Sequence, residues 1–525
     1  MSQPATDHHA APVTPRFLVT AEEAYPAFED AVLDAQDSII AGFRIFDFST
    51  RLRSTRAQAI GRDWFDLILD ALNRGVSVRL MLSDFDPVVG EALHADSWRA
   101  VRIGAALREL APEGADVHVS ANLHPARLTG VARLALWPKV QVMLSKRARA
   151  ISAMTPDARA QYLRDRPGLA AQLVEYGDGV RPRHWMMPEL APVTHHQKVA
   201  VIDRRRLYCG GLDLNERRYD TKLHQKPAAT TWHDVQLMLD DPRAAGQAAE
   251  HLEDFIPVTR RMQTARRGDG TVLRTLSKAA RGLSRVLAPR KVLSEIEAEI
   301  LDGIASADRL IYIETQFMRD RRIARALQKA AKRAPSLQLF MVLPAAPEDV
   351  AFERNSGSDA RFGEYLQARC IRRIRQAFGS RAFIGSPVQP RPSQSGDRDT
   401  LYGAPLIYVH SKVCLFDDKA GLVSSANLNG RSLRWDTEFG VPLRDTGSVV
   451  ELRTRLLQHW LGETITGDAA RPFCALETCV DAWRAQAAAN TGTPPKERGG
   501  FLVPYKAGPG RRFGRDIPLA PDELV

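Results

Sequence analysis

The sequence predicts an α/β protein built from two similar halves. Three observations support this fold class: a long motif that occurs twice in register, short apolar strands that alternate with helical stretches, and a composition typical of a globular chain. The chain has 525 residues, of which 44% are hydrophobic. That length accommodates two ordinary domains or one large duplicated domain with a substantial buried core.

The repeated motif carries a His, a Lys and an Asp at the same stride in both copies. The first copy is "HHQKVAVIDRRRLYCGGLDLN" (195–215) and the second is "VHSKVCLFDDKAGLVSSANLNGR" (409–431). An in-register match over some twenty residues indicates an internal duplication. The equivalent pairs are His196 and His410, Lys198 and Lys412, Asp203 and Asp417, Gly210–Gly211 and Ser424–Ser425, Asp213 and Asn427, Asn215 and Asn429, and Arg217 and Arg431.

The segments upstream of each motif also correspond, although more faintly. A helical stretch (21–35 and 292–307) precedes an apolar, aromatic-rich strand (37–48 and 308–318) in each half. A further helix then leads to a buried strand that ends in a loop rich in Pro and Asp. Helices that alternate with apolar strands predict an α/β layer architecture in each half.

These patterns divide the chain into five parts. We expect a disordered tail (1–16), an N-terminal half (17–258) with an insertion at about 88–190, a basic linker (259–292), a C-terminal half (293–470) and a C-terminal extension (471–525) that is an extended tail from about Ala489. The insertion forms either a lid or an ordinary packed excursion.

The net charge of +11 is concentrated in one segment, because residues 260–291 hold ten Lys or Arg and one acidic residue. Within it, basic residues recur in a 4-3-4 rhythm with leucines between them, which predicts a cationic amphipathic helix. Such a helix suits an anionic membrane surface, and the alternative is a solvated linker helix. No nucleic acid partner is expected, because aromatic residues do not interleave with the basic ones. The basic residues of the rhythm are Arg274, Lys278, Arg281 and Arg285.

No run of 18 or more apolar residues occurs, and the N-terminus lacks the pattern of a secretory signal. We therefore expect the protein to be cytoplasmic or peripheral to a membrane, with secretion by a signal-peptide-independent route as the alternative. The five cysteines have no metal-ligand spacing, so we expect buried free thiols rather than disulfides.

A His placed two residues before a Lys on a strand directs both side chains to the same face. Two such strands that meet at a pseudo-twofold axis bring two imidazoles and two ammonium groups around one point. This arrangement suits a phosphodiester, since the lysines stabilise the charge on phosphorus without a metal. One neutral imidazole attacks phosphorus and the other protonates the leaving alkoxide. A carboxylate must orient each ring, and the candidates are Asp234 and either Glu438 or Asp436.

At this point the sequence resembles the phospholipase D superfamily, which is defined by two H-x-K-x4-D motifs. The resemblance extends over about residues 17–465, and "GGLDL", "WHDV" and "IYIETQF" are similar to segments of lipid-cleaving members. It implies a duplicated phospholipase D fold in which two α/β-sandwich halves, related by a pseudo-twofold axis, share one active site.

The resemblance also implies roles for individual residues. His196 is expected to be the nucleophile and His410 the general acid, with Asp234 and Glu438 orienting the rings. Asp203 and Asp417 are expected to be structural, at the turn after each motif strand. The first half departs from the family pattern where Gly210, Gly211 and Asp213 replace Ser and Asn. The expected phosphate-binding set is Lys198, Lys412, Ser424, Ser425 and Asn427, with Asp213 at the position equivalent to Asn427.

The function expected is hydrolysis of glycerophospholipids to phosphatidic acid and a free head-group alcohol, with transphosphatidylation when an alcohol is present. The alternatives are a phosphatidyltransferase such as a cardiolipin synthase, a phosphodiester nuclease, or a non-catalytic lipid-binding protein. We expect no cofactor and no metal, because no clustered carboxylate loop is visible. The expected partners are a phospholipid substrate and an anionic membrane surface, and the protein is expected to be a monomer.

Overall fold

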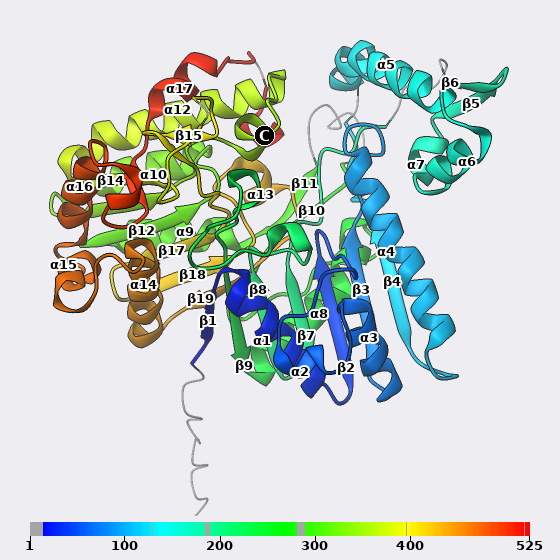
Figure 1. Cartoon of the computed structure of the whole chain (residues 1–525), viewed down its shortest axis with the longest axis horizontal. Coiled ribbons are helices and arrows are strands. Elements are labelled where there is room, and N and C mark those ends of the chain that lie inside the picture. The colour runs from blue at the N-terminus through cyan, green and yellow to red at the C-terminus, as the bar shows by residue number, and fades with distance from the viewer. Residues whose placement is uncertain (1–13, 129, 184–188, 281–288, 395, 519) are drawn as a thin grey trace, which may run out of the picture.

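A computed structural model of the chain describes residues 14–128, 130–183, 189–280, 289–394, 396–518 and 520–525, which form two α/β halves (Figure 1). The N-terminal half is built on a seven-stranded sheet of order β1-β9-β8-β7-β2-β3-β4. Its strands are β1 (Arg16–Val19), β2 (Ser38–Phe43), β3 (Ser77–Ser83), β4 (Val117–Asn122), β7 (Val199–Ile202), β8 (Arg206–Gly210) and β9 (Val235–Asp240).

The C-terminal half is built on a nine-stranded sheet of order β11-β10-β19-β18-β17-β12-β13-β14-β20. Its strands are β10 (Leu273–Lys278), β11 (Arg290–Ser294), β12 (Leu310–Thr315), β13 (Gln338–Val342), β14 (Ala382–Pro387), β17 (Lys412–Phe416), β18 (Ala420–Ser424), β19 (Glu438–Leu443) and β20 (Leu502–Pro504). A two-stranded sheet of β15 (Thr400–Leu401) and β16 (Ala404–Pro405) lies outside it.

The two sheets share one topology. The order β9-β8-β7-β2-β3-β4 in the first matches β19-β18-β17-β12-β13-β14 in the second. In both, the last three strands pair in parallel and the others pair antiparallel. The register agrees as well, since Ile39 faces Ile202 as Ile311 faces Phe416. The duplicated α/β fold predicted from the sequence is therefore confirmed.

Helices cover the outer face of each sheet, and one helix of each half belongs to a shared central core. The outer helices are α1 (Thr20–Asp34), α3 (Trp64–Asn73) and α4 (Glu91–Leu110) in the first half and α9 (Glu295–Ser306), α10 (Arg321–Arg333) and α12 (Ser358–Phe378) in the second. The central ones are α8 (Pro242–Thr259) and α14 (Thr446–Leu461). Short helices are α2 (Thr55–Gln58), α11 (Glu348–Ala351), α13 (Gly430–Arg434) and α15 (Arg471–Cys474).

The motif strands are buried on both faces, which explains their continuous apolar sequences. In β7, Val199 and Val201 point into the central core, whereas Ala200 and Ile202 point into the outer core of the N-terminal half. In β17, the residues equivalent to Val199 and Val201 also enter the central core, and their neighbours enter the outer core of the C-terminal half. The central core thus joins the two sheets across the junction.

Asp203 and Asp417 lie at the far end of each motif strand and hold the turn to the neighbouring strand. Both adopt the left-handed conformation, with φ of 52° and 53°, a region that Asp tolerates better than most residues. The Asp203 carboxylate accepts hydrogen bonds from the backbone N–H groups of 36–38 at 2.8–2.9 Å. The Asp417 carboxylate accepts those of 308–310 at 2.8–3.1 Å. Each carboxylate therefore fastens the start of β2 or β12 to the end of β7 or β17.

The prediction of an amphipathic helix within 259–292 is wrong for the first part of that helix. Residues 273–278 form strand β10, which pairs antiparallel with β19 and β11. Thr275 and Ser277 are buried, and the Arg274 guanidinium forms an ion pair with Glu295 at 2.8 Å. This segment pairs with the edge of β19. In the N-terminal half, β1 pairs in the same way with β9, the equivalent of β19. The last part of the expected helix, 281–288, lies outside the described residues.

The C-terminal extension is folded rather than an extended tail. It contains α16 (Cys479–Asn490), the edge strand β20 and α17 (Ala507–Phe513). Strand β20 pairs antiparallel with β14, and the Asn490 side chain donates hydrogen bonds to the backbone carbonyls of Gly499 and Leu502 at 2.9 and 3.0 Å. The Gly and Pro residues therefore form turns between packed elements.

The insertion of the first half is shorter than expected. Helix α4 and strand β4 fall within 88–190, yet they are the equivalents of α12 and β14 and belong to the repeated unit. The true excursion projects beyond the sheets at the upper right of Figure 1 and has a small hydrophobic core of its own. Its elements are α5 (Gly130–Ser152), α6 (Pro156–Arg164), α7 (Pro167–Ala170), β5 (Leu173–Tyr176) and β6 (Gly179–Pro182).

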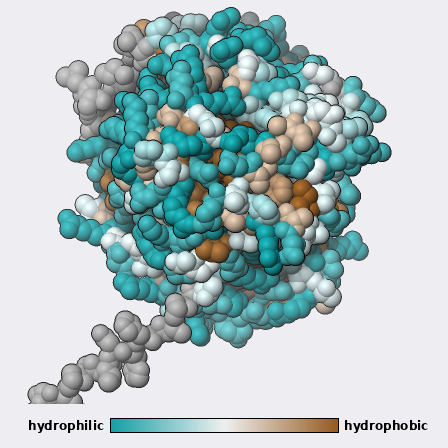
Figure 2. Space-filling model, turned by 90° about the vertical axis from the view of Figure 1, so that its left-hand side faces the viewer, coloured by the Kyte–Doolittle hydropathy of each residue, from teal (hydrophilic) through white to brown (hydrophobic). Residues whose placement is uncertain are grey.

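The surface is mostly hydrophilic where Figure 2 shows it, with small hydrophobic patches between polar residues. Among the described residues, no helix is long and apolar enough to cross a membrane. The five cysteines are free, and four of them are buried, which confirms the expectation of buried thiols.

We predict that Asp203→Gly lowers the free energy of unfolding by about 2–3 kcal/mol. Glycine suits the positive φ, so the variant removes only the three hydrogen bonds to the backbone, each of which contributes about 1 kcal/mol. Urea unfolding followed by circular dichroism measures the change. Asp70→Ala, which removes an exposed i,i+4 ion pair with Arg74, is the control and should change the value by less than about 0.5 kcal/mol. Equal stability of Asp203→Gly and the parent protein would contradict this role.

Candidate active site

The two motif histidines lie at the start of equivalent strands and line one cavity. His196 precedes β7 and His410 precedes β17, and their exposed fractions are 8% and 6%. The cavity has a volume of about 950 Å³ and is lined by residues of both halves. The fold thus brings together the two histidines that the sequence places 214 residues apart.

The carboxylate that orients each histidine ring comes from the opposite half of the protein. Asp234 of the first half accepts a hydrogen bond from His410 Nδ1 at 2.7 Å. Glu438 of the second half contacts His196 Nδ1 at 3.0–3.1 Å through both oxygens. With Nδ1–H bound to a carboxylate, each ring keeps the Nε2 lone pair for the cavity. Asp436, the alternative candidate, instead binds the Thr194 N–H at 2.8 Å.

Backbone hydrogen bonds also connect each motif histidine to the opposite half. The His196 N–H donates to the Thr437 carbonyl at 2.8 Å, and the His410 N–H donates to the His233 carbonyl at 2.8 Å. Each histidine is therefore held twice by the segment that supplies its carboxylate. Because this segment belongs to the opposite half, neither half can assemble an oriented imidazole alone.

The motif lysines are buried behind the histidines. Lys198 is fully buried and its Nζ donates to the His196 carbonyl at 2.5 Å. Lys412 is 4% exposed and its Nζ donates to the His410 carbonyl. Burial lowers the pKa of both ammonium groups, and that of Lys412 falls to about 7. An anion bound in the cavity would raise these two pKa values again, because it favours the charged form of each lysine.

The pKa values of both histidines are well below 6.5. Burial is the main cause, and nearby cations add to it: Lys198 and Arg44 for His196, and Lys412 and Arg218 for His410. Burial also raises the pKa of the Glu438 carboxyl to about 8 and that of Asp234. Without an anion in the cavity, both imidazoles are therefore neutral near pH 7. A neutral imidazole is the form required of a nucleophile.

Arginine side chains supply positive charge around a cavity that Asp and Glu side chains line as well. Arg218 stacks 3.6 Å from the Trp232 ring centroid and Arg319 stacks 3.8 Å from that of Phe317. Arg44 follows β2 directly, at the position equivalent to Gln316 after β12. The repeated motif did not predict these groups. A polar residue directly after the strand beside each motif strand could have indicated them. The arginines that line the cavity are Arg44, Arg147, Arg217, Arg218, Arg319 and Arg431.

The residues expected to bind phosphate divide into two groups. Asn427 lines the cavity, and its buried Oδ1 has no hydrogen-bond partner among the described residues. The two lysines, Lys198 and Lys412, and the two serines, Ser424 and Ser425, do not line it. The Ser425 hydroxyl donates to Glu438 at 2.5 Å. Ser425 therefore supports the carboxylate that orients His196.

Asp213 is placed differently from its equivalent Asn427. Its carboxylate accepts the Ile45 N–H at 2.9 Å and lies 3.9 Å from Lys198 Nζ. It does not line the cavity. An anionic side chain repels phosphate, so Asp213 is better described as the counter-ion of Lys198 than as a phosphate ligand.

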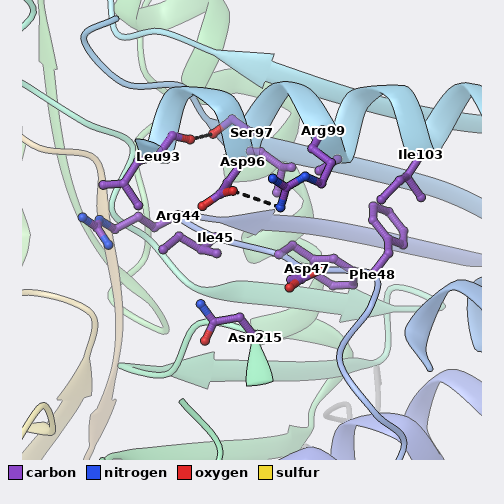
Figure 3. Close-up of a pocket in the computed structure, with 13 residues that line it drawn as sticks. Arg44, Ile45, Asp47, Phe48, Leu93, Asp96, Ser97, Arg99, Ile103 and Asn215 are labelled. Atoms are coloured by element: carbon purple, nitrogen blue, oxygen red, sulfur yellow. Dashed lines mark hydrogen bonds and ion pairs between the residues drawn. The ribbon is translucent and has the colours of Figure 1, made fainter. Parts of the chain in front are cut away.

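A small side pocket of about 120 Å³ adjoins the main cavity (Figure 3). Arg44 and Asn215 belong to the linings of both. In Figure 3, Phe48 and Ile103 close the end of the side pocket away from Arg44. The pocket thus leads from a cationic mouth to an apolar end.

Comparison with known proteins identifies similar sequences. A family model described as "Cardiolipin synthase, PLD-like domain" matches residues 300–460. Phospholipase D zeta 1 of Arabidopsis thaliana is 29% identical over an alignment of 204 residues that covers 33% of this chain and 18% of that protein. The chain belongs to the phospholipase D superfamily.

Other similarities cover more of the chain. Phospholipase D A of Dictyostelium discoideum is 21% identical over an alignment of 332 residues that covers 51% of this chain and 26% of that protein. The matched region thus spans only about a fifth to a quarter of these two curated relatives. The crystal structure of phosphatidylserine synthase from Haemophilus influenzae Rd KW20 is similar over 92% of this chain and 95% of that one, with 12% identity and a TM-score of 0.44.

We predict that His196 and His410 remain neutral at about pH 6, because a histidine with a lowered pKa takes up its proton only at more acidic pH. Histidine-selective ¹⁵N labelling reads the protonation state of each ring, and spectra of His196→Asn and His410→Asn assign the signals. Addition of tungstate, an oxyanion that mimics phosphate, should raise the pKa of at least one of the two rings. Rings already protonated at about pH 6 without an anion would contradict the electrostatic description.

Proposed function

We propose that this chain is a phospholipase D that hydrolyses glycerophospholipids to phosphatidic acid and a free head-group alcohol. One observation carries the proposal: two imidazoles, each oriented by a carboxylate of the opposite half, face a single cavity lined by arginines. Two orientable nitrogen bases suit double displacement at an anionic phosphodiester, and the arginines of the lining can pair with its charge.

In the first step, the His196 Nε2 lone pair forms a bond to phosphorus while the bond from phosphorus to the head-group oxygen breaks. His410 gives its Nε2 proton to that oxygen, so the alcohol leaves neutral. The substrate anion favours protonation of His410, because it offsets the nearby cations that lower the pKa. Lys198, Lys412 and Asn427 stabilise the charge on the non-bridging oxygens.

In the second step, His410 takes a proton from water, the water oxygen bonds to phosphorus, and the bond between phosphorus and His196 breaks. Phosphatidic acid is released and both rings return to their starting state. A primary alcohol in place of water gives the phosphatidyl alcohol by the same step.

A phosphatidyltransferase is the second candidate, and the family model that matches residues 300–460 favours it, because its description is that of a cardiolipin synthase domain. The same phosphohistidine serves both reactions, and only the acceptor differs. The acceptor therefore has to be identified from the products.

We further propose that the protein acts as a peripheral membrane protein through helix α5. Leu134, Trp137 and Val142 are exposed by 59%, 36% and 56%. The basic residues Lys139 and Lys146 are exposed on the same helix. Apolar side chains mixed with lysines suit an anionic lipid surface. Arg147 of the same helix lines the main cavity, so a membrane bound there would present lipid to the site.

The decisive measurement is mass spectrometry of mixed phospholipid vesicles incubated with the protein and a little ethanol. We predict phosphatidic acid and phosphatidylethanol as products, and a fall of roughly 10³-fold or more for His196→Asn, because it removes the nucleophile. His118→Asn, an exposed histidine on β4, is the control and should retain full activity. Unchanged lipids with well-folded protein would refute the proposal, whereas lipid products formed only with a polyol acceptor would favour the transferase.

We predict that Leu134→Ser combined with Trp137→Ser weakens binding to anionic vesicles by roughly 10-fold while turnover of a short-chain soluble phospholipid is unchanged, because the helix contacts lipid surface rather than the reacting phosphate. Co-sedimentation measures the binding. A matched double variant at Leu110 and Met262, which lie outside this excursion and are exposed by 61% and 75%, is the control. Equal loss in both double variants would contradict a specific role for α5.

We propose that the chemistry needs no metal at the reacting phosphate, since lysine and arginine supply the positive charge there. The initial rate should therefore be the same when EDTA or Ca²⁺ is added to the assay. An immediate loss of activity in EDTA that Ca²⁺ restores would place a cation in the reaction instead.

A further inference from the structure

Three histidines that do not line the main cavity converge at the junction of the two halves. His224 and His233 belong to the first half, and His459 lies on α14 of the second. His459 Nε2 is 3.0 Å from His224 Nε2 and 3.1 Å from His233 Nδ1. The candidate ligand atoms of all three lie within 4.8 Å of one another. The tautomers of these rings determine what the triangle can hold.

Buried carboxylates determine the tautomers of two of the rings. His224 Nδ1 donates to Asp220 at 2.7 Å, and His233 Nε2 donates to Glu314 at 2.9 Å. Since these outer nitrogens carry the protons, the inner nitrogens of the neutral rings present lone pairs to His459. A carboxylate on the far nitrogen is the usual outer partner of a metal-bound histidine.

Both carboxylates are fully buried and carry a charge that needs balancing. Glu314 accepts hydrogen bonds from His233, Ser411, Tyr312 and Trp460 at 2.6–2.9 Å, which requires the ionised form. Asp220 accepts the Trp232 and Thr221 N–H groups besides His224. Within the described part of the chain, the ion pairs of both carboxylates are to histidine and none is to lysine or arginine. Two buried negative charges therefore face one cluster of imidazoles.

Protons alone do not satisfy this cluster. If the rings are neutral, His459 Nε2–H can donate fully to only one of the two lone pairs that face it. If His224 and His233 are both protonated to balance the carboxylates, two N–H groups compete for the single lone pair of His459 Nε2. A divalent cation accepts all three lone pairs and balances both carboxylates at once.

We propose that His224, His233 and His459 bind a transition-metal dication, Zn²⁺ by preference, with Asp220 and Glu314 as outer-shell partners. Three imidazoles suit Zn²⁺. Tetrahedral zinc at about 2.0–2.1 Å from each nitrogen separates its ligands by about 3.3–3.4 Å, close to the two separations of 3.0 and 3.1 Å. His459 is partly exposed, which provides a route for the ion and a position for a water ligand.

The ion would join the halves beside the catalytic histidine without contacting substrate. His233 precedes Asp234, and its carbonyl accepts the His410 N–H at 2.8 Å. Glu314 also accepts the Ser411 hydroxyl at 2.7 Å. His233 is thus a positioning residue, and the metal has a structural role. This inference does not depend on the proposed lipid reaction.

The test is the metal content of the full-length protein, grown with zinc and freed of loose metal by gel filtration, by inductively coupled plasma mass spectrometry. We expect about one zinc per chain in the parent protein and a loss of at least 10-fold in His459→Ala. His459→Cys keeps a ligand atom and should retain zinc. His251→Gln, which changes a buried histidine that contacts Gln197, should retain zinc as well.

Two further readouts separate metal binding from a general loss of structure. Co²⁺ added to the stripped parent protein should give the visible absorption of a tetrahedral site, and His459→Ala should not. Prolonged chelation should lower the Tm of the parent protein by roughly 5 °C or more, because the ion binds only the folded state, and should leave the Tm of His459→Ala unchanged. A well-folded parent protein that binds neither Zn²⁺ nor Co²⁺, or a His459→Ala variant that binds both equally, would overturn the proposal.

Discussion

The site depends on one constraint: each half supplies the carboxylate that orients the imidazole of the other. Asp234 holds His410 and Glu438 holds His196, each supported by a backbone hydrogen bond from the same segment. The central hydrophobic core that joins the two sheets is therefore also what assembles the site. Duplication within one chain makes this exchange reliable, because the two copies are always present together.

Burial is the second determinant of the site. It removes the histidines and lysines from water, so the pKa of each imidazole and ammonium group falls and that of each carboxyl rises. The groups consequently depend on one another for their charge states. An anion that enters the cavity would raise the pKa values of the imidazoles and ammonium groups and so favour their protonated forms.

The segment 259–292 shows the limit of periodicity as evidence. Its 4-3-4 spacing of basic residues fits a helix, yet residues 273–278 form strand β10 because β19 offers an unpaired edge. A tertiary partner of this kind outweighs local propensity, which amounts to less than about 1 kcal/mol per residue. The same holds for the C-terminal extension, where β14 offers its edge to β20.

The sequence by itself determined the duplication, the α/β class and the two motif histidines with their lysines, because these depend on spacing along a strand, and spacing is local. The tertiary structure decided which carboxylate serves which ring, that Ser425 supports Glu438, and that Asp213 accompanies Lys198. It also decided that His224, His233 and His459 meet. Contacts between residues 176 to 242 positions apart, such as those of the two histidine–carboxylate pairs, follow from how the two halves pack, and no periodicity in the sequence records that.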